Sequence, residues 1–301
     1  MEGPLPESCR WPMHDLKVTS WPATGHRANE DCAVVSRDVA VVVDGAGLPA
    51  SMRSGCRHTV AWYARQLAHR LHQQLGNARV SLRRALRAAI ADLAQAHMST
   101  CDLAAGSPSA TVAAWRMRAT TLEYLVLSDS SVILLHAEGR HQHVTDDRLD
   151  RAVARGVDAL LAGRPAAAAP LSSVELRAVR RGIIDAQRNT PDGFWCCHHD
   201  PSAADEARTG SVALSSLTGA VLATDGAVRG AHLLHAHTLA EMAALAVAGR
   251  HGELLGQIRR AECEQRAFLS ASALKHHDDA TVVSARIGPP RPAVPTLPER
   301  H

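Results

Sequence analysis

The sequence predicts an α+β protein in which a mainly antiparallel sheet system is covered by helices. Short runs rich in valine and other strand-forming residues follow one another with only turns or polar breaks between them. Two long helical patterns come in succession, joined by a short link. Strands and helices do not alternate one by one, so a doubly wound parallel sheet, which needs repeated strand–helix–strand units, is the weaker alternative.

The first half of the chain contains a hairpin, a helix pair and a meander of strands. The hairpin is expected at Cys32 to Val35 and Val39 to Val43, because the residues between them have turn composition. A helix is expected from about Gly55 to Leu75, and a second from Ser81, whose hydroxyl suits an N-cap. We expect the two helices to form an antiparallel pair lying on a sheet. The strands of the meander are expected at 110–115, 121–127, 132–136 and 141–144.

The second half begins with an alanine-rich helical region from Asp150 to Ala186, interrupted by an irregular piece from Arg164 to Pro170. The proline-rich residues after Ile287 are expected to be disordered. Between these segments the patterns predict a strand at 219–224, helices at 236–248 and 252–268, and a last strand at 280–285.

Composition and charge exclude several classes of protein. The chain has 301 residues, 46% of them hydrophobic, which is enough for a sizeable core. The net charge is only +3 and the arginines are scattered among acids, which is typical of solvated faces and not of a nucleic-acid patch. No apolar run approaches the ~20 residues of a membrane span, and the N-terminus lacks the features of a secretory signal. We therefore expect a soluble, cytoplasmic protein with no nucleic-acid or membrane partner.

The cysteines indicate buried or incidental thiols. The chain has seven of them, an odd number, and no two have the Cys-x-x-Cys spacing typical of zinc or redox sites. The run Cys196-Cys197-His198-His199 is an alternative metal site, but zinc ligands are normally spaced so that several converge on one ion. The cysteines are Cys9, Cys32, Cys56, Cys101, Cys196, Cys197 and Cys263.

Acidic residues stand at the ends of several predicted strands. Asp31 precedes the first hairpin strand, and Asp44 ends the second. Asp129 lies in a break between strands, Asp225 follows an apolar strand, and Asp278-Asp279 precede the last one. Carboxylates brought together repel one another unless they are protonated or neutralised, and Mg²⁺ or Mn²⁺ would neutralise them with oxygen ligands. The sequence therefore predicts a divalent metal site suited to hydrolysis.

The glycine that follows Asp44, and the one that follows Asp225, would let the chain turn sharply and leave a backbone carbonyl facing a metal ion. The alternative is that each acid is an ordinary turn or cap residue. Spacing along the chain does not by itself decide between these interpretations.

A series of short motifs favours the metal site. In chain order they are Arg27-x-Asn29-Glu30-Asp31, Val43-Asp44-Gly45-Ala46-Gly47, Ser109-Ala110-Thr111, Leu127-Ser128-Asp129-Ser130, Thr145-x-Asp147, Ala223-Thr224-Asp225-Gly226 and Asp278-Asp279-Ala280-Thr281-Val282-Val283. The series resembles the PP2C-type metal-dependent serine/threonine protein phosphatases of the PPM family, in their bacterial form. The resemblance implies a four-layer α/β/β/α sandwich, with two mainly antiparallel sheets flanked by helix pairs. It covers residues 14–287, between an N-terminal extension at 1–13 and a tail at 288–301.

The resemblance also implies roles for individual residues. Asp44 would bridge two Mg²⁺ or Mn²⁺ ions, and the carbonyl of Gly45 would bind one of them. Asp225 and Asp278 would hold the other ion, so that Asp44, Asp225 and Asp278 form the catalytic set. Asp31 would act on the metal site directly or through a water molecule.

Two further roles concern the substrate and a third metal. Arg27 would bind the substrate phosphate, because the planar guanidinium contacts two oxygens at once and stays charged near pH 7. Asp129 would help to bind a third, looser ion. The implied reaction is hydrolysis of phosphoserine or phosphothreonine in a protein substrate by a metal-activated water, without a covalent enzyme intermediate.

The chain departs from the family pattern at three places. Eukaryotic relatives often have histidine at the position of Ala46, so no general acid is assigned here. Arg27 is one residue closer to Asp31 than in the commoner pattern. The family's Gly-Asp-Ser-Arg is here Ser128-Asp129-Ser130-Ser131, which bears on the third metal site.

Two other segments have two interpretations each. The run His276-His277-Asp278-Asp279 is either a transition-metal cluster or, as we favour, histidines that support a hard-metal ligand or face solvent. The segment Asn189 to Trp195 is either a loop held by its aromatic residues or part of a flap over the site.

Alternative functions are a catalytically silent module that binds phosphoproteins, and a hydrolase of small phosphate esters on the same fold. The sequence does not indicate the cognate substrate, the choice between Mg²⁺ and Mn²⁺, or the oligomeric state.

Overall fold

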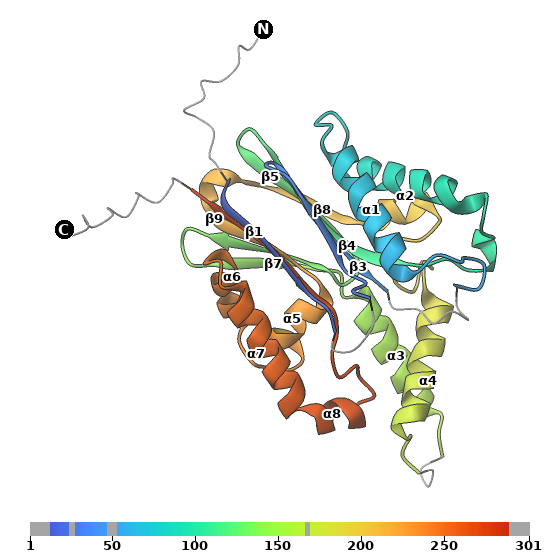
Figure 1. Cartoon of the computed structure of the whole chain (residues 1–301). Coiled ribbons are helices and arrows are strands. Elements are labelled where there is room, and N and C mark those ends of the chain that lie inside the picture. The colour runs from blue at the N-terminus through green and yellow to red at the C-terminus, as the bar shows by residue number, and fades with distance from the viewer. Residues whose placement is uncertain (1–12, 24–27, 47–52, 166–168, 289–301) are drawn as a thin grey trace, which may run out of the picture.

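Two antiparallel sheets face each other in the computed structural model, and helices cover the outer face of each (Figure 1). The structure describes residues 13–23, 28–46, 53–165 and 169–288. Every pair of neighbouring strands in both sheets is antiparallel. The predicted α+β sandwich is therefore confirmed.

The first sheet contains both the N-terminal and the C-terminal strands of the described chain. Its five strands, in spatial order, are β1 (Met13–Trp21), β10 (Ala280–Ile287), β9 (Leu217–Ala223), β6 (Ser131–His136) and β7 (His141–Val144). The strand β1 lacks a strong apolar pattern and was not among the predicted strands.

The second sheet is built around the predicted hairpin and meander. Its five strands, in spatial order, are β2 (Cys32–Val35), β3 (Val39–Gly45), β4 (Ala110–Arg118), β5 (Thr121–Leu127) and β8 (Arg208–Ala213). The edge strand β8 is polar and largely exposed, so the sequence pattern did not predict it.

The middle of the second sheet, at β3 and β4, is buried on both faces, which explains why β3 is almost wholly apolar. Val41 and Val43 point toward the covering helices, whereas Val42 points toward the first sheet. In the layer between the sheets, Val42 meets Trp115 of β4 and Leu222 of β9 in one buried cluster.

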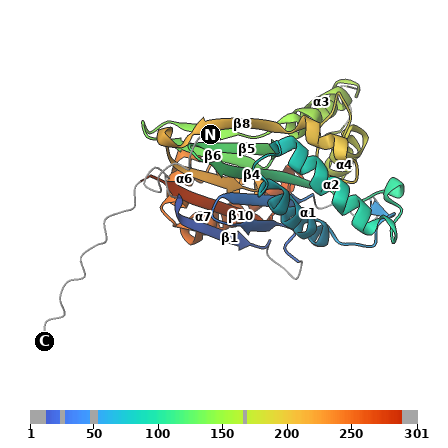
Figure 2. The same ribbon diagram turned by 90° about the horizontal axis from the view of Figure 1, so that it is seen from above.

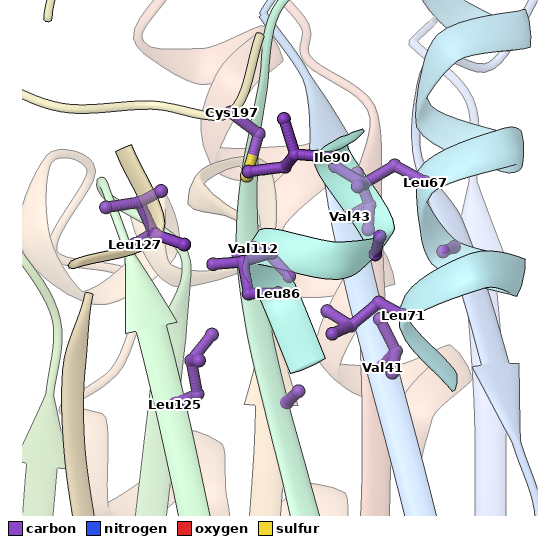
Figure 3. Close-up of a cluster of buried hydrophobic side chains, with 14 of the residues drawn as sticks. Val41, Val43, Leu67, Leu71, Leu86, Ile90, Val112, Leu125, Leu127 and Cys197 are labelled. Atoms are coloured by element: carbon purple, nitrogen blue, oxygen red, sulfur yellow. The ribbon is translucent and has the colours of Figure 1, made fainter. Parts of the chain in front are cut away.

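The helices α1 (Val60–Leu75) and α2 (Leu82–Met98) form the predicted pair on the second sheet. Figure 3 shows their buried side chains meeting those of the strands. Ser81 caps α2 as predicted. The expected start of α1 at Gly55 is wrong, because Thr59 caps the helix by accepting a hydrogen bond from the Trp62 amide.

The first sheet is covered by α5 (Asp225–His232), α6 (Leu239–Val247), α7 (His251–Glu264) and α8 (Arg266–Ala271). The single helix expected at 252–268 is two helices, because the chain breaks at Gln265. The short helix α5 was not predicted.

The helices α3 (Arg148–Ala162) and α4 (Ser173–Gln187) form a hairpin at one end of the sheets, as Figures 1 and 2 show. They confirm the predicted helical region. Short 3₁₀ turns occur at η3 (Leu103–Ala105), η4 (Pro201–Glu206) and η5 (Leu214–Ser216). Within the described ranges, no helix has both the length and the apolar composition of a membrane span. Residues 1–12 and the predicted tail from 289 lie outside the described residues.

Candidate active site

The second sheet supplies Asp31 and Asp44 at the open end of its hairpin. Asp31 directly precedes β2, and Asp44 is the last residue but one of β3, paired with Thr111 of β4. The Gly45 amide donates a hydrogen bond of 3.1 Å to the Glu30 carbonyl, which ties the two strand ends together. The two carboxylates therefore lie at one end of the sheet.

The first sheet supplies Asp225 and Asp278 at the same end of the sandwich. Asp225 is the first residue of α5, just after β9, and Asp278 lies two residues before β10. The Thr224 hydroxyl donates to Asp31 Oδ2 at 3.0 Å and accepts from the Thr281 amide at 3.0 Å. Thr224 thus joins the first sheet to the aspartate that precedes the second.

The two Asp-Gly pairs do not turn the chain in the way we expected. Neither Gly45 nor Gly226 is among the glycines of positive φ in the described residues. A Cβ on Gly45 would lie 2.8 Å from the Glu30 carbonyl oxygen, and one on Gly226 would lie 1.8 Å from the Asp279 carbonyl oxygen. The glycines are needed because backbone segments approach each other too closely for a side chain.

Asp129 lies in the crossing between the sheets, because β5 belongs to the second sheet and β6 to the first. Ser128 before it has a φ of 67°, a left-handed conformation that turns the chain between the strands. The Thr145 hydroxyl contacts the Ser130 carbonyl oxygen at 3.1 Å and the Asp129 carbonyl oxygen at 3.3 Å. The Thr145 hydroxyl therefore fixes the backbone of this crossing.

The five carboxylates form one electrostatic cluster around Asp225. Burial and the neighbouring charges of Asp225, Asp31 and Asp278 raise the pKa of Asp44 well above its ordinary value. Burial and the charge of Asp225 raise the pKa of Asp31 to about 7, and also raise the pKa of Asp129 to about 8. The same two causes raise the pKa of Asp278 to about 6. The carboxylates therefore carry more negative charge than their surroundings balance.

One lysine stands beside this cluster. Lys275 Nζ lies 2.8 Å from Asp278 Oδ1. Burial opposes the charge of the ammonium group, but Asp278, Asp225 and Asp44 raise the pKa of Lys275 above its usual value. A single ammonium group does not balance five carboxylates.

Asp150 and Asp279 are site residues that sequence reasoning did not assign. Asp150 is in the first turn of α3, and burial and the charge of Asp225 raise its pKa. Asp279 instead binds two backbone amides, since its carboxylate accepts hydrogen bonds from the Ala23 amide at 2.6 Å and the Glu30 amide at 2.7 Å. The only signal for Asp150 is an acid in the first turn of a helix, which is too common to identify a site.

The cluster fits hard divalent cations. Asp31 Oδ1 and Asp129 Oδ1 are buried with no hydrogen-bond partner among the described residues. A buried carboxylate oxygen without a donor is costly unless a cation satisfies it. The side-chain oxygens of the cluster all belong to carboxylates, which suit Mg²⁺ or Mn²⁺ better than softer metals.

The remaining residues of the predicted site are placed as follows. Arg27 lies outside the described residues. Ala46 offers no proton donor in its side chain, and its amide binds the Ser109 carbonyl at 2.9 Å. His277 Nδ1 lies 2.8 Å from Glu262 Oε2, and His276 Nε2 lies 2.7 Å from Ser270 Oγ. The two histidines thus have separate partners, which supports the interpretation that they are not a metal cluster.

The adjacent cysteines are buried thiols. Burial raises the pKa of Cys196 to about 11 and that of Cys197 well above its ordinary value. Cys197 lies in the hydrophobic cluster beneath α1 and α2 (Figure 3). These thiols are therefore part of the core and not a metal site.

The loop from Asn189 to Trp195 is held by its aromatic residues and by polar contacts. Phe194 is 4% exposed and packs with Ala152 and Cys196. The Asn189 side chain donates to the Cys196 carbonyl at 3.1 Å and accepts from the Cys196 amide at 2.8 Å. This supports the interpretation of an anchored loop.

Comparisons with solved structures find the same fold. The structure of the Mycobacterium tuberculosis serine/threonine phosphatase PstP/Ppp is 15% identical, with a TM-score of 0.51, covering 92% of this chain and 99% of that one. The catalytic domain of PstP in complex with 2 manganese ions is 16% identical, with a TM-score of 0.52 and the same coverage of 92% and 99%. Stp1 from Staphylococcus aureus is 12% identical, with a TM-score of 0.55, covering 96% of this chain and 100% of that one.

At these identities the structural likeness shows the fold alone. A search of curated proteins finds no match to this chain. The family model of protein phosphatase 2C, however, matches residues 25–262, which include Asp31, Asp44, Asp129 and Asp225. The chain therefore belongs to the protein phosphatase 2C family.

Proposed function

We propose that this protein hydrolyses phosphoserine and phosphothreonine in protein substrates and depends on Mg²⁺ or Mn²⁺. The observation that carries the proposal is the convergence of carboxylates from both sheets, with buried oxygens of Asp31 and Asp129 unpaired among the described residues. Membership of the phosphatase family supports the same conclusion.

The residues that would hold two ions are Asp44, Gly45, Asp225 and Asp278, with Asp31 acting directly or through water. Asp129 would hold a third, looser ion. When bound, such ions supply an activated water molecule and offset charge on the phosphoryl oxygens. The PstP catalytic domain, a solved relative, contains two manganese ions.

Residues around the cluster would position these ligands. Lys275 orients Asp278 through its contact of 2.8 Å, and Thr224 orients Asp31 through its contact of 3.0 Å. Asp279 accepts a hydrogen bond from the Glu30 amide and so keeps the two sheets close together at this end.

Phosphate binding stays assigned to Arg27 by the family resemblance. A cytoplasmic location also stays a prediction.

The first test is hydrolysis of a phosphothreonine peptide by metal-stripped protein, with Mn²⁺ and then Mg²⁺ added back. Asp44→Asn keeps the shape of the side chain but removes one anionic ligand. We expect activity only with metal, and a loss of at least about 100-fold in the variant, since even residues that only support metal ligands cost 10–100-fold. The matched control is Asp92→Asn, an exposed carboxylate on α2.

Each other outcome has a definite meaning. Unimpaired turnover by Asp44→Asn would refute the metal assignment. No turnover by folded, metal-loaded protein would favour the silent phosphoprotein-binding module. Faster hydrolysis of small phosphate esters than of phosphopeptides would favour the small-ester hydrolase.

A further inference from the structure

Four sulfur and nitrogen ligands meet beside the helix pair α1 and α2, outside the carboxylate cluster. Cys56 and His58 lie just before α1, in the residues that precede its cap at Thr59. His97 is in the last turn of α2, and Cys101 follows that helix. Because the two helices are antiparallel, the start of α1 and the end of α2 lie together.

The distances within this group match the edges of a tetrahedral metal site. Cys56 Sγ lies 3.5 Å from Cys101 Sγ, 3.4 Å from His58 Nδ1 and 3.6 Å from His97 Nδ1. Cys101 Sγ lies 3.4 Å from His58 Nδ1, and all four ligand atoms lie within 4.8 Å of one another. Tetrahedral zinc with sulfur at about 2.3 Å and nitrogen at about 2.0–2.1 Å has ligand-to-ligand edges of about 3.4–3.8 Å.

The local backbone holds these ligands together. The Asp102 amide donates to the Gly55 carbonyl at 2.8 Å, and the Gly55 amide donates to the Ala105 carbonyl at 3.2 Å. A Cβ on Gly55 would lie 1.7 Å from the Asp102 carbonyl oxygen, so only glycine permits this approach. The segment before Cys56 is therefore bound to the segment after Cys101.

The two histidines are also oriented by their surroundings. The His58 ring stacks on Trp62 with a centroid distance of 3.9 Å and an interplanar angle of 19°. His97 is 1% exposed, and its Nε2 has no hydrogen-bond partner among the described residues. The His97 imidazole therefore makes its polar contact through Nδ1, which faces Cys56 Sγ.

We propose that Cys56, His58, His97 and Cys101 bind one zinc ion as a structural site. Two thiolates and two neutral imidazoles balance the charge of Zn²⁺, and four protein ligands leave no open position for substrate. Thiolate and imidazole ligands select zinc over the hard cations that suit the carboxylate cluster. The zinc ion joins the start of α1 to the end of α2.

The zinc site is independent of the proposed phosphatase activity. Its ligands are Cys56-x-His58 and His97-x-x-x-Cys101, two short pairs that are separated in sequence by most of the helix pair. A search for Cys-x-x-Cys spacing does not find it. Under this proposal Cys56 and Cys101 are metal ligands, whereas the sequence predicts buried or incidental thiols.

The test uses the full chain, purified in reducing buffer with one equivalent of Zn²⁺ and passed over a desalting column. Metal analysis should find one zinc per chain in the wild type and less than one tenth of that in Cys56→Ser and in Cys101→Ser. Cys263→Ser, which changes an exposed thiol on α7, is the matched control and should keep its zinc.

Cobalt gives a second readout that does not depend on activity. Co²⁺ in the wild type should show a thiolate-to-cobalt charge-transfer band and the strong visible bands of tetrahedral coordination. Both should vanish in Cys101→Ser and persist in Asp44→Asn, which alters only the carboxylate cluster. Circular dichroism confirms folding, and the partly exposed Cys101 provides the usable variant if Cys56→Ser does not fold.

Three results would overturn the proposal. They are absence of zinc from folded, reduced wild-type protein, full retention of zinc by both cysteine variants, and a Cys56–Cys101 disulfide that persists when zinc is present during purification. If Asp44→Asn loses phosphatase activity but keeps the cobalt spectrum of the wild type, the carboxylate cluster and the zinc site are independent. A failure of one proposal then leaves the other standing.

Discussion

His251 shows how one buried side chain connects stability to pH. It is fully buried at the start of α7, with Nδ1 at 3.1 Å from Thr19 Oγ1 and Nε2 at 2.8 Å from Ser284 Oγ. Thr19 lies on β1 and Ser284 on β10, so the imidazole binds two neighbouring strands. Burial and the nearby charge of Lys17 lower the pKa of His251 to about 4.

The unfolded chain takes up a proton on His251 near pH 6.5, whereas the folded protein does so only near pH 4. The unfolded state therefore binds more protons between these values, and stability is lost as pH falls through this window. Between pH 7 and pH 4.5, the free energy of unfolding of the wild type should fall by up to about 3 kcal/mol more than that of His251→Asn. Urea unfolding at both pH values measures the difference, and equal losses in the two proteins would contradict the assignment.

At the scale of elements, the helix α7 holds the loop that carries Asp278. Glu262 on α7 is fully buried, and its carboxylate contacts Arg229 at 3.0 Å and Arg259 at 2.8 Å. Arg229 donates to the Lys275 carbonyl at 2.8 Å, and Arg259 donates to the Asp278 carbonyl at 2.7 Å. One buried carboxylate on a helix thus positions the backbone of a candidate metal ligand.

Glu262→Gln should leave two guanidinium groups, from Arg229 and Arg259, without their buried counter-charge. Removing one partner of a buried ion pair costs about 3–5 kcal/mol. We expect a fall of this size in the free energy of unfolding, together with weaker Mn²⁺ binding, because the loop before β10 loses its support. Calorimetry and Mn²⁺ titration measure the two effects.

The control is Glu253→Gln on the same helix, where the carboxylate forms an exposed ion pair with Arg250. This substitution should change stability by less than about 1 kcal/mol. Equal effects of both substitutions would exclude a special role for Glu262.

At the scale of the whole molecule, the carboxylate cluster is where the two sheets meet. Asp31 and Asp44 come from the second sheet, and Asp225 and Asp278 from the first. Without metal, their mutual repulsion acts across the sandwich and opposes the packing of its layers. The same cluster that would bind metal is therefore expected to destabilise the metal-free fold.

The sign of this effect is opposite to that of His251. Asp31, Asp129 and Asp278 have pKa values of about 7, 8 and 6 in the fold, above the ordinary value of 3.8. The folded state therefore binds more protons than the unfolded state, and these groups remove stability as pH rises from about 4 to about 8. We expect Asp129→Asn to be more stable than the wild type at pH 8 without added metal, and nearly equal to it at pH 4.5. Thermal melts in the same buffer test this, and a variant less stable than the wild type at pH 8 would contradict it.

Addition of Mn²⁺ should reverse the ranking, because the wild type binds the ion more tightly than the variant does and bound ligand stabilises the folded state. A melting temperature that does not respond to Mn²⁺ in the wild type would show that the carboxylates do not hold the ion.

The predictable part of the protein depended on local pattern. A continuous apolar run rich in valine predicted β3, helical spacing and a serine cap predicted α2, and the positions of Asp44 and Asp225 at the ends of apolar strands predicted members of the cluster. Elements with little local pattern were missed, such as the polar edge strand β8. The start of α1 was missed because the residues before it pair with the segment after α2 instead of extending the helix.

The series of motifs that resembles the phosphatase family named the candidate metal ligands of the carboxylate cluster. The sequence by itself also determined the order of most elements and the apolar faces that form the layers. These properties depend on residues near one another in the chain, where spacing sets which side chains share a face. Only the tertiary structure decided that Asp150 approaches the cluster, that Gly45 and Gly226 serve close backbone contact, and that Cys56 meets Cys101. Each of these depends on the packing of segments distant in sequence, which periodicity does not encode.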